Sequence, residues 1–165
     1  MEINKTVANP LLVGAMQLLK AEDTPEHRKL MLEELSKATL LAPAKLNPEP
    51  IQDENGVYKP EDPKAPIQMQ FPMLTAKDGN RFFVAFTDNT SMMDDGENPQ
   101  VNTPEEFRKY TVTMRIQDFA KMLVTKDAAG NDCPCVGVVI NPFRENVLFN
   151  RQMAAAMLGL IKPAQ

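Results

Sequence analysis

Residues 81–88 read RFFVAFTD and residues 135–142 read CVGVVINP, and these two apolar runs decide the fold of the chain. Each run is typical of a buried strand that breaks into polar residues at its C-terminal end. The two runs therefore predict a folded domain with a sheet at its centre. No recognisable catalytic constellation, metal site or phosphate-binding loop accompanies them in the sequence.

Two helices are expected ahead of the sheet, because Asn9-Pro10 and Thr24-Pro25 each place a proline directly after an N-cap residue. The Asn9 side chain is expected to accept a hydrogen bond from an amide of the first helical turn. Leucines and a methionine after Pro10 cover a broad face, so the first helix is expected to be largely buried. The second helix is expected to run to about Ala38, with an apolar stripe opposite a charged face.

Shorter patterns predict the strands around the two central runs. Residues 39–43 predict a first strand that ends at Pro43, and apolar residues alternate with Gln over 67–71, which predicts a half-buried strand. Residues 77–80, KDGN, are typical of a hairpin turn. The sequence therefore predicts that strand 67–71 pairs antiparallel with strand 82–87.

The C-terminal half contains further patterns, and its first part, 89–102, is turn-forming and acidic. The patterns predict a short helix from Thr103-Pro104, a strand at 111–114, a helix over 116–123, a strand at 146–149 and a final helix capped by Asn150. Strands and helices neither alternate strictly nor segregate fully, so we expect an α+β fold. Its sheet is expected to be mixed or largely antiparallel, with the N-terminal helical hairpin and the C-terminal helix packed mainly on one face.

The length of 165 residues is that of one domain with a single core. Half of the 14 prolines lie between Pro43 and Pro72. We therefore interpret about 43–66 as a long Pro-rich connection or insertion within a single domain that spans 1–165.

Composition argues against several classes of partner. A net charge of −4 and a pI near 5.1, without a basic cluster, argue against nucleic-acid binding. The longest apolar tract is far shorter than the ~18–20 residues of a membrane span, so no membrane partner is expected. Two cysteines do not make a disulfide framework, and the N-terminus lacks a signal-peptide pattern. A cytoplasmic location is therefore expected.

Several short motifs occur together in one order along the chain. They are Asn9 with the leucines that follow it, the passage 35–43, Phe86-Thr87-Asp88 and, above all, GVVINPF at 137–143. In this order the chain resembles the N-terminal domain of the SseB family, a bacterial module, from about Asn9 to Leu160. The resemblance implies a small cytoplasmic α+β domain without an established biochemical activity. It carries no catalytic residue over to this chain.

Polar residues follow both central runs and are the best candidates for a binding site. They are Thr87 and Asp88 after the first run, and Asn141, Phe143 and Arg144 after the second. If the two strands run parallel, these residues share one edge of the sheet. In the alternative interpretation, Asp88 and Asn141 only cap turns with their own side chains.

Other reactive residue types lack the pattern that their chemistry needs, so we expect no catalytic residue, metal or cofactor. His27 lies on the polar face of the second helix and is interpreted as solvated. Cys133 and Cys135 have the wrong spacing for a zinc site and no second ligand pair. The acidic residues within 88–98 lack EF-hand spacing. The glycines are isolated, which argues against a nucleotide-binding loop.

The leading hypothesis is a non-catalytic protein-interaction or regulatory module that binds an unidentified protein partner. Exposed apolar residues of the Pro-rich stretch, Ile51, Val57 and Tyr58, are candidate contacts. An alternative is a binder of a small anionic metabolite, or an enzyme, that uses Asp88, Asn141 and Arg144. A further alternative is a homodimer built through an exposed strand edge.

Overall fold

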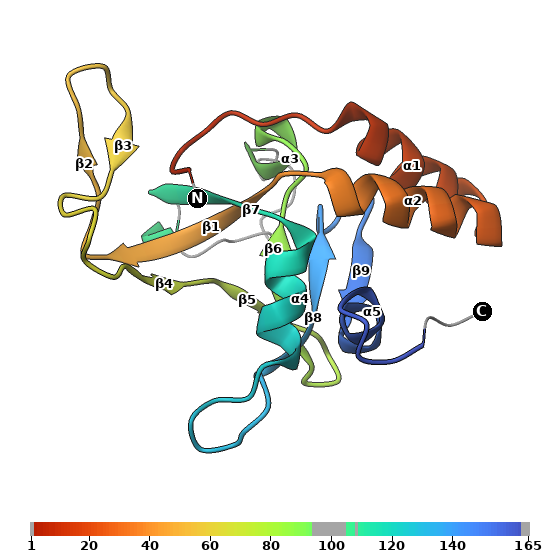
Figure 1. The fold of residues 1–165 in the computed structure, drawn as a ribbon. Helices are drawn as coiled ribbons and strands as arrows, with labels where there is room; N and C mark the ends of the chain where they lie inside the picture. Colours follow the sequence, from red (N-terminus) through yellow and green to blue (C-terminus); the bar gives the residue numbers. More distant parts are fainter. Residues whose placement is uncertain (1, 94–104, 108, 163–165) are drawn as a thin grey trace.

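The structure is a computed structural model that describes residues 2–93, 105–107 and 109–162, and it confirms the α+β class (Figure 1). The described α-helices are α1 (Pro10–Ala21), α2 (Pro25–Lys37), α3 (Asn89–Met93), α4 (Ile116–Val124) and α5 (Arg151–Met157). The strands are β1 (Leu40–Asn47), β2 (Ile51–Gln52), β3 (Tyr58–Lys59), β4 (Gln68–Gln70), β5 (Met73–Thr75), β6 (Arg81–Ala85), β7 (Tyr110–Met114), β8 (Cys135–Ile140) and β9 (Val147–Asn150). A short 3₁₀ helix, Glu105–Phe107, precedes β7.

The strands form a mixed but mostly antiparallel arrangement. One sheet has the order β5-β6-β8-β9, in which β6 and β8 are parallel, and a second has the order β4-β1-β7. The sheets meet at Leu41 and Phe86, whose backbones exchange hydrogen bonds of 2.9 and 2.8 Å. The two apolar runs are thus neighbouring central strands, β6 and β8.

The main core lies on one face of the β6–β8 pair. Phe83 and Ala85 of β6 and Val138 and Ile140 of β8 are buried there against side chains of α1, α2, α4 and α5. A smaller cluster on the opposite face contains Val84 and is packed by the N-terminal segment and α3. The helices therefore cover mainly one face, as expected.

The predicted pairing of strand 67–71 with strand 82–87 is wrong. β4 pairs instead with the end of β1, and the partner of β6 is β5, which begins after Pro72. Proline has no N–H for a sheet ladder, so Pro72 separates the segment into two short strands with different partners. The predicted hairpin turn is confirmed, since the Ala76 N–H donates to the Asn80 carbonyl at 2.8 Å.

The first strand does not end at Pro43, because β1 continues to Asn47. The Leu41 N–H points away from β7 and donates to the Phe86 carbonyl. Because the backbone N–H direction alternates along a strand, the backbone nitrogen of Pro43, two residues later, faces the same side as that of Leu41. On that side, pairing with β4 starts only at Lys45. The missing N–H of Pro43 therefore falls in a gap between two described partners and interrupts no ladder.

Both N-terminal helices start where the sequence predicts, but Asn9 does not cap α1. Its Nδ2 donates to the carbonyls of Thr39 and Thr87, each at 2.7 Å, and so ties the start of α1 to β1 and β6. The helix is also less buried than expected, since Leu11 is 72% exposed. Thr24 does cap α2, because its hydroxyl accepts the His27 N–H at 3.1 Å.

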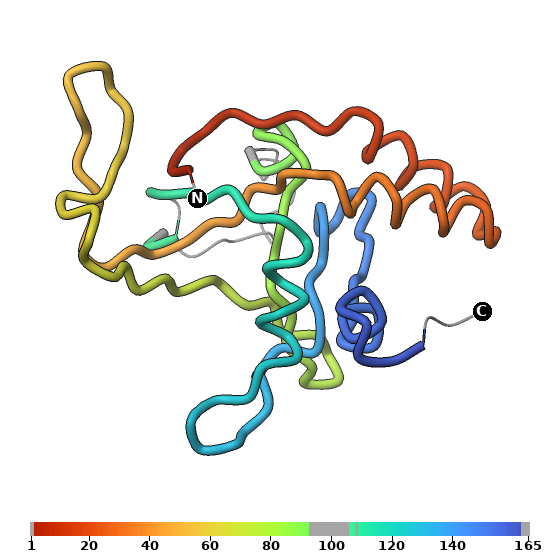
Figure 2. Tube along the Cα trace, in the orientation of Figure 1, coloured from red at the N-terminus to blue at the C-terminus, as the bar shows by residue number. Residues whose placement is uncertain are grey.

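The Pro-rich stretch contains an ordered hairpin that projects from the body of the molecule (Figure 2). Its strands β2 and β3 are joined by a turn in which Asp53 accepts the N–H groups of Asn55 and Val57. Tyr58 is half-buried, with its ring edge-on to Tyr110 at 5.8 Å. The predicted helix start at Thr103-Pro104 lies outside the described residues, whereas part of the expected acidic turn region forms α3.

Candidate functional site

The parallel pairing of β6 and β8 brings the polar residues after both strands to one edge of the sheet. Thr87 and Asn141 are fully buried there. The Thr87 N–H donates to Asn141 Oδ1 at 3.0 Å, and Asn141 Nδ2 donates to Thr87 Oγ1 at 2.9 Å. The carboxamide thus joins the ends of two strands that are 54 residues apart in sequence.

Asn141 also organises the turn between β8 and β9. It has a φ of +50°, a left-handed conformation that Asn tolerates better than most residues. Its carbonyl accepts the N–H groups of Arg144 and Asn146 at 3.1 and 3.0 Å, and its Nδ2 lies 3.2 Å from Glu145 Oε2. The oxygen and the nitrogen of the buried side-chain amide are therefore both engaged in hydrogen bonds that stabilise the local structure.

Asp88 caps α3 in the same network. Its Oδ1 accepts the Ser91 N–H at 2.6 Å, and its Oδ2 accepts hydrogen bonds from the Thr87 and Ser91 hydroxyls at 2.7 and 3.1 Å. Burial acts to raise the pKa of Asp88. The hydrogen bonds from Thr87 and Ser91, together with the charge of Arg144, outweigh burial and hold the pKa below its ordinary value.

The remaining two predicted site residues lie at the rim of this network. Arg144 is exposed, and its Nη1 lies 3.4 Å from Ser91 Oγ. Phe143 is 46% exposed and has a φ of +66°. The structure thus brings Thr87, Asp88, Asn141 and Arg144 together, in contacts of the kind that turn-capping side chains make. A binding role for these residues stays a prediction.

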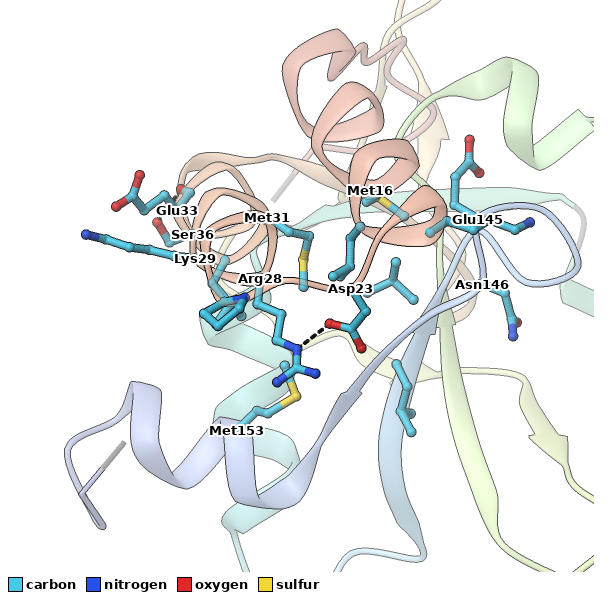
Figure 3. A pocket seen from close by; sticks show the side chains of 16 residues that line it. Met16, Asp23, Arg28, Lys29, Met31, Glu33, Ser36, Glu145, Asn146 and Met153 are labelled. Atoms are coloured by element: carbon cyan, nitrogen blue, oxygen red, sulfur yellow. Dashed lines mark hydrogen bonds and ion pairs between the residues drawn. The ribbon is translucent and has the colours of Figure 1, made fainter. Parts of the chain in front are cut away.

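A larger feature lies beside this network and was missed from the sequence. It is a cleft of about 1040 Å³ between the α1–α2 hairpin on one side and β9 with α5 on the other. Figure 3 shows Met31 and Met153 approaching it from opposite walls, with Glu145 and Asn146 at the end near the β8–β9 turn. Apolar surface makes up most of the lining, and the residues that contribute to it include Met16, Leu19, Met31, Leu32, Leu148 and Met153.

The cleft continues along α5. A second cavity of about 350 Å³ is lined by Phe149, Met157 and Ile161, and it shares Leu32 and Met153 with the cleft. The two cavities are therefore adjacent, and we refer to them together as the groove. Its apolar lining residues come from separate elements, so in the sequence each of these apolar residues looks like an ordinary core residue. The frequency of methionine, 11 residues, was the one available signal.

Two polar contacts lie beside the cleft, one within the α1–α2 hairpin and one between α1 and the β8–β9 turn. Asp23 and Arg28 form an exposed ion pair there (Figure 3). Lys20 Nζ donates to the Arg144 carbonyl at 2.7 Å, which ties the C-terminal end of α1 to the β8–β9 turn. The cleft and the polar network at the sheet edge are therefore neighbours that share this turn.

Cys135 and His27 are two described residues of chemically reactive types. Cys135 is buried, and burial raises the pKa of its thiol to about 12. His27 is in the first turn of α2, and its Nδ1 lies 2.7 Å from the Glu22 carbonyl. Within residues 2–93, 105–107 and 109–162, no three His, Cys, Asp or Glu side chains group as a metal site. No helix in that part of the chain has the length and apolar character to cross a membrane.

A comparison with protein families identifies the domain, because the SseB protein N-terminal domain matches residues 12–156. The chain belongs to the SseB family. The SseB match begins within α1 and ends within α5, so it spans both the polar network and the walls of the cleft. This match confirms the resemblance seen in the sequence. No curated protein and no solved structure matches the chain.

Proposed function

We propose that this SseB-family domain is a non-catalytic protein-interaction module and that the apolar cleft between the α1–α2 hairpin and β9–α5 is its binding surface. The cleft itself is the observation that carries the proposal. Its volume of about 1040 Å³ and its continuation along α5 give it room for several side chains of a partner.

The chemistry of the lining supports a protein partner. Three methionines contribute to the lining, and of these Met153 is partly exposed, whereas Met16 and Met31 are buried. Thioether side chains are flexible and polarisable, so they adapt to apolar partners of different shape. Leu148 adds an apolar side chain that is 43% exposed, and exposed apolar surface of this kind is typical of interaction sites.

The anionic-metabolite alternative has less support. Asp88, Asn141 and Arg144 do lie together, but the side chains of Asp88 and Asn141 are occupied by hydrogen bonds within the network. The lowered pKa keeps Asp88 negative at neutral pH, and that charge repels an anion. The cleft, in contrast, has an apolar lining that a partner can fill.

The hairpin contacts proposed from the sequence are a separate candidate surface. Ile51 and Val57 are 40% and 56% exposed on the β2–β3 hairpin, whereas Tyr58 packs on Tyr110. The hairpin presents isolated apolar side chains, and none of its residues lines the cleft or the second cavity. We therefore place the binding surface in the cleft.

Selection from a random peptide display library tests the proposal. Peptides selected on the wild-type protein are titrated against Leu32→Glu and against the matched variant Leu30→Glu on the same helix. Leu32 lines both cavities, whereas Leu30 is 38% exposed and lines neither of them. We expect Leu32→Glu to abolish binding and Leu30→Glu to preserve it, with the melting temperature of each variant measured in parallel. Equal binding to both variants would place the site elsewhere.

A further inference from the structure

The outer edge of β9 contributes to a wall of the cleft. Among the described strands, β9 is the last in the order β5-β6-β8-β9, so it pairs with β8 on one side only. Asn146, Val147 and Leu148 line the cleft, and Phe149 and Asn150 line its continuation. The strand β9 therefore contributes residues to both cavities.

The register shows which backbone groups face this groove. The Asn141 N–H donates to the Ala85 carbonyl of β6. Because successive residues of a strand point their N–H and C=O groups to opposite sides, the backbone groups of Ile140 and Val138 point toward β9. Their partners Val147 and Phe149 must then point their own N–H and C=O groups back toward β8. Leu148, between these two residues, presents its N–H and C=O to the outer edge.

We propose that the partner in the cleft is an extended peptide segment that adds to β9 as a further strand and pairs with the backbone of Leu148. This inference rests on the proposed function and specifies how the partner binds. Strand addition uses main-chain hydrogen bonds for affinity and pockets for alternate side chains for specificity. In this groove the open backbone edge of β9 lies beside the apolar cavities that could receive the side chains.

The side chains along β9 indicate the chemistry of the peptide. Val147 and Phe149 are buried toward the helices, whereas Leu148 is exposed. In an added strand, alternate side chains follow the row of Val147 and Phe149 and enter the space between α2 and α5. That space is lined by Leu32 and Met153, so these positions of the peptide are apolar.

The charges around the cleft favour an uncharged segment. Its lining contains the cations Lys20, Arg28 and Lys29 and the anions Asp23, Glu33 and Glu145, whose formal charges cancel. A strongly charged peptide gains no net attraction from such a rim. Apolar side chains in alternate positions of a neutral peptide complement both the lining and the rim.

The walls favour a single extended segment over a second copy of this chain. The helices α2 and α5 stand on either side of the groove. A second copy that presented its own β9 would bring its own α1–α2 hairpin and α5 to the same place. An extended segment carries no such layer and needs only the width of one strand.

Two substitutions of one residue test strand addition. Leu148→Pro removes the outward N–H, and proline is tolerated on an edge strand where the N–H faces solvent. Leu148→Ala removes most of the side chain but keeps the N–H. With peptides selected on the wild-type protein, we expect Leu148→Pro to weaken binding at least about tenfold more than Leu148→Ala, which loses the apolar side-chain contact but keeps the N–H.

A peptide modification provides a readout that does not depend on folding of a variant. We expect N-methylation of the peptide residue whose N–H donates to the Leu148 carbonyl to abolish binding to the wild-type protein, and N-methylation of the next residue to be tolerated. If Leu148→Pro and every N-methylated peptide bind normally while Leu32→Glu does not bind, strand addition is wrong and the cleft function stands. If no selected peptide is sensitive to Leu32→Glu, the proposed function fails and this inference fails with it.

Discussion

The side chain of Asn141 exchanges two hydrogen bonds with Thr87, one to its N–H at 3.0 Å and one to its hydroxyl at 2.9 Å. Both residues are fully buried, so these bonds replace water at the ends of β6 and β8. They fix the turn that leads to β9 and hence one end of the cleft. The polar residues at the sheet edge thus position the binding surface that we propose.

Replacing Asn141 should destabilise the domain in two separable ways. Asn141→Ala leaves the Thr87 N–H without a partner and places Ala at a positive φ, so we expect a loss of about 2–4 kcal/mol in the free energy of unfolding. Asn141→Gly loses the same bonds without the steric cost and should lose about 1–3 kcal/mol. Urea denaturation measures both. A change below about 0.5 kcal/mol for Asn141→Ala would contradict the role of this residue.

Asp88 should make stability depend on pH. Its pKa in the folded protein lies below the ordinary 3.8, so its contribution is complete above about pH 5 and is lost as pH falls through the folded pKa. We expect wild type to be more stable than Asp88→Asn at pH 7 and the difference to shrink below about pH 4. Urea denaturation at pH 7 and pH 3 checks this. A difference that stays constant would show that the charge of Asp88 makes no contribution.

The two cysteines should differ in reactivity. Cys135 is fully buried and its pKa is raised to about 12, whereas Cys133 is half-buried. Because the thiolate is the nucleophile, iodoacetamide at pH 8 should alkylate Cys133 first and leave Cys135 unmodified in the native protein. Peptide mass spectrometry at successive times measures the extent of alkylation at each cysteine. Equal rates under native conditions would contradict the burial of Cys135.

Arg151 should be more important for stability than a surface arginine. Its Nε donates to the Leu123 carbonyl at 3.1 Å, and its Nη2 donates to the carbonyls of Cys133 and Cys135 at 2.9 Å each. Lysine cannot reproduce this fork, so Arg151→Lys should cost about 2–3 kcal/mol. The control Arg115→Lys affects an exposed guanidinium that bonds to one carbonyl and should cost less than about 1 kcal/mol. Similar melting temperatures for the two variants would refute this difference.

Local signals in the sequence were sufficient for the central strands and for the starts of α1, α2, α4 and α5, but not for α3, which lies in a region expected to be turn-forming. The apolar runs predicted β6 and β8, and Asn150 caps α5 as predicted, since its Oδ1 accepts the Met153 N–H at 2.8 Å. Such signals act within one element. They could not show that Pro43 continues β1, because that depends on a gap between the partners of β1, which lie far away in sequence.

In the candidate site, too, one part could be predicted from local signals and another depends on residues that are distant in sequence. The residues after β6 and β8 were predicted to meet at one edge if the strands run parallel, and that condition is met. The cleft could not be predicted, because Leu32 on α2 and Met153 on α5 become neighbours only in the folded chain. In the sequence both residues look like ordinary core positions of amphipathic helices.

Amide hydrogen exchange of the wild-type protein, with and without a peptide selected on it, tests the central claim most directly. We expect the peptide to slow exchange along β9 and in the facing parts of α2 and α5, and to leave the β2–β3 hairpin unchanged. Protection confined to that hairpin, or to residues 87–91 and 141–144, would contradict the assignment of the cleft as the binding surface.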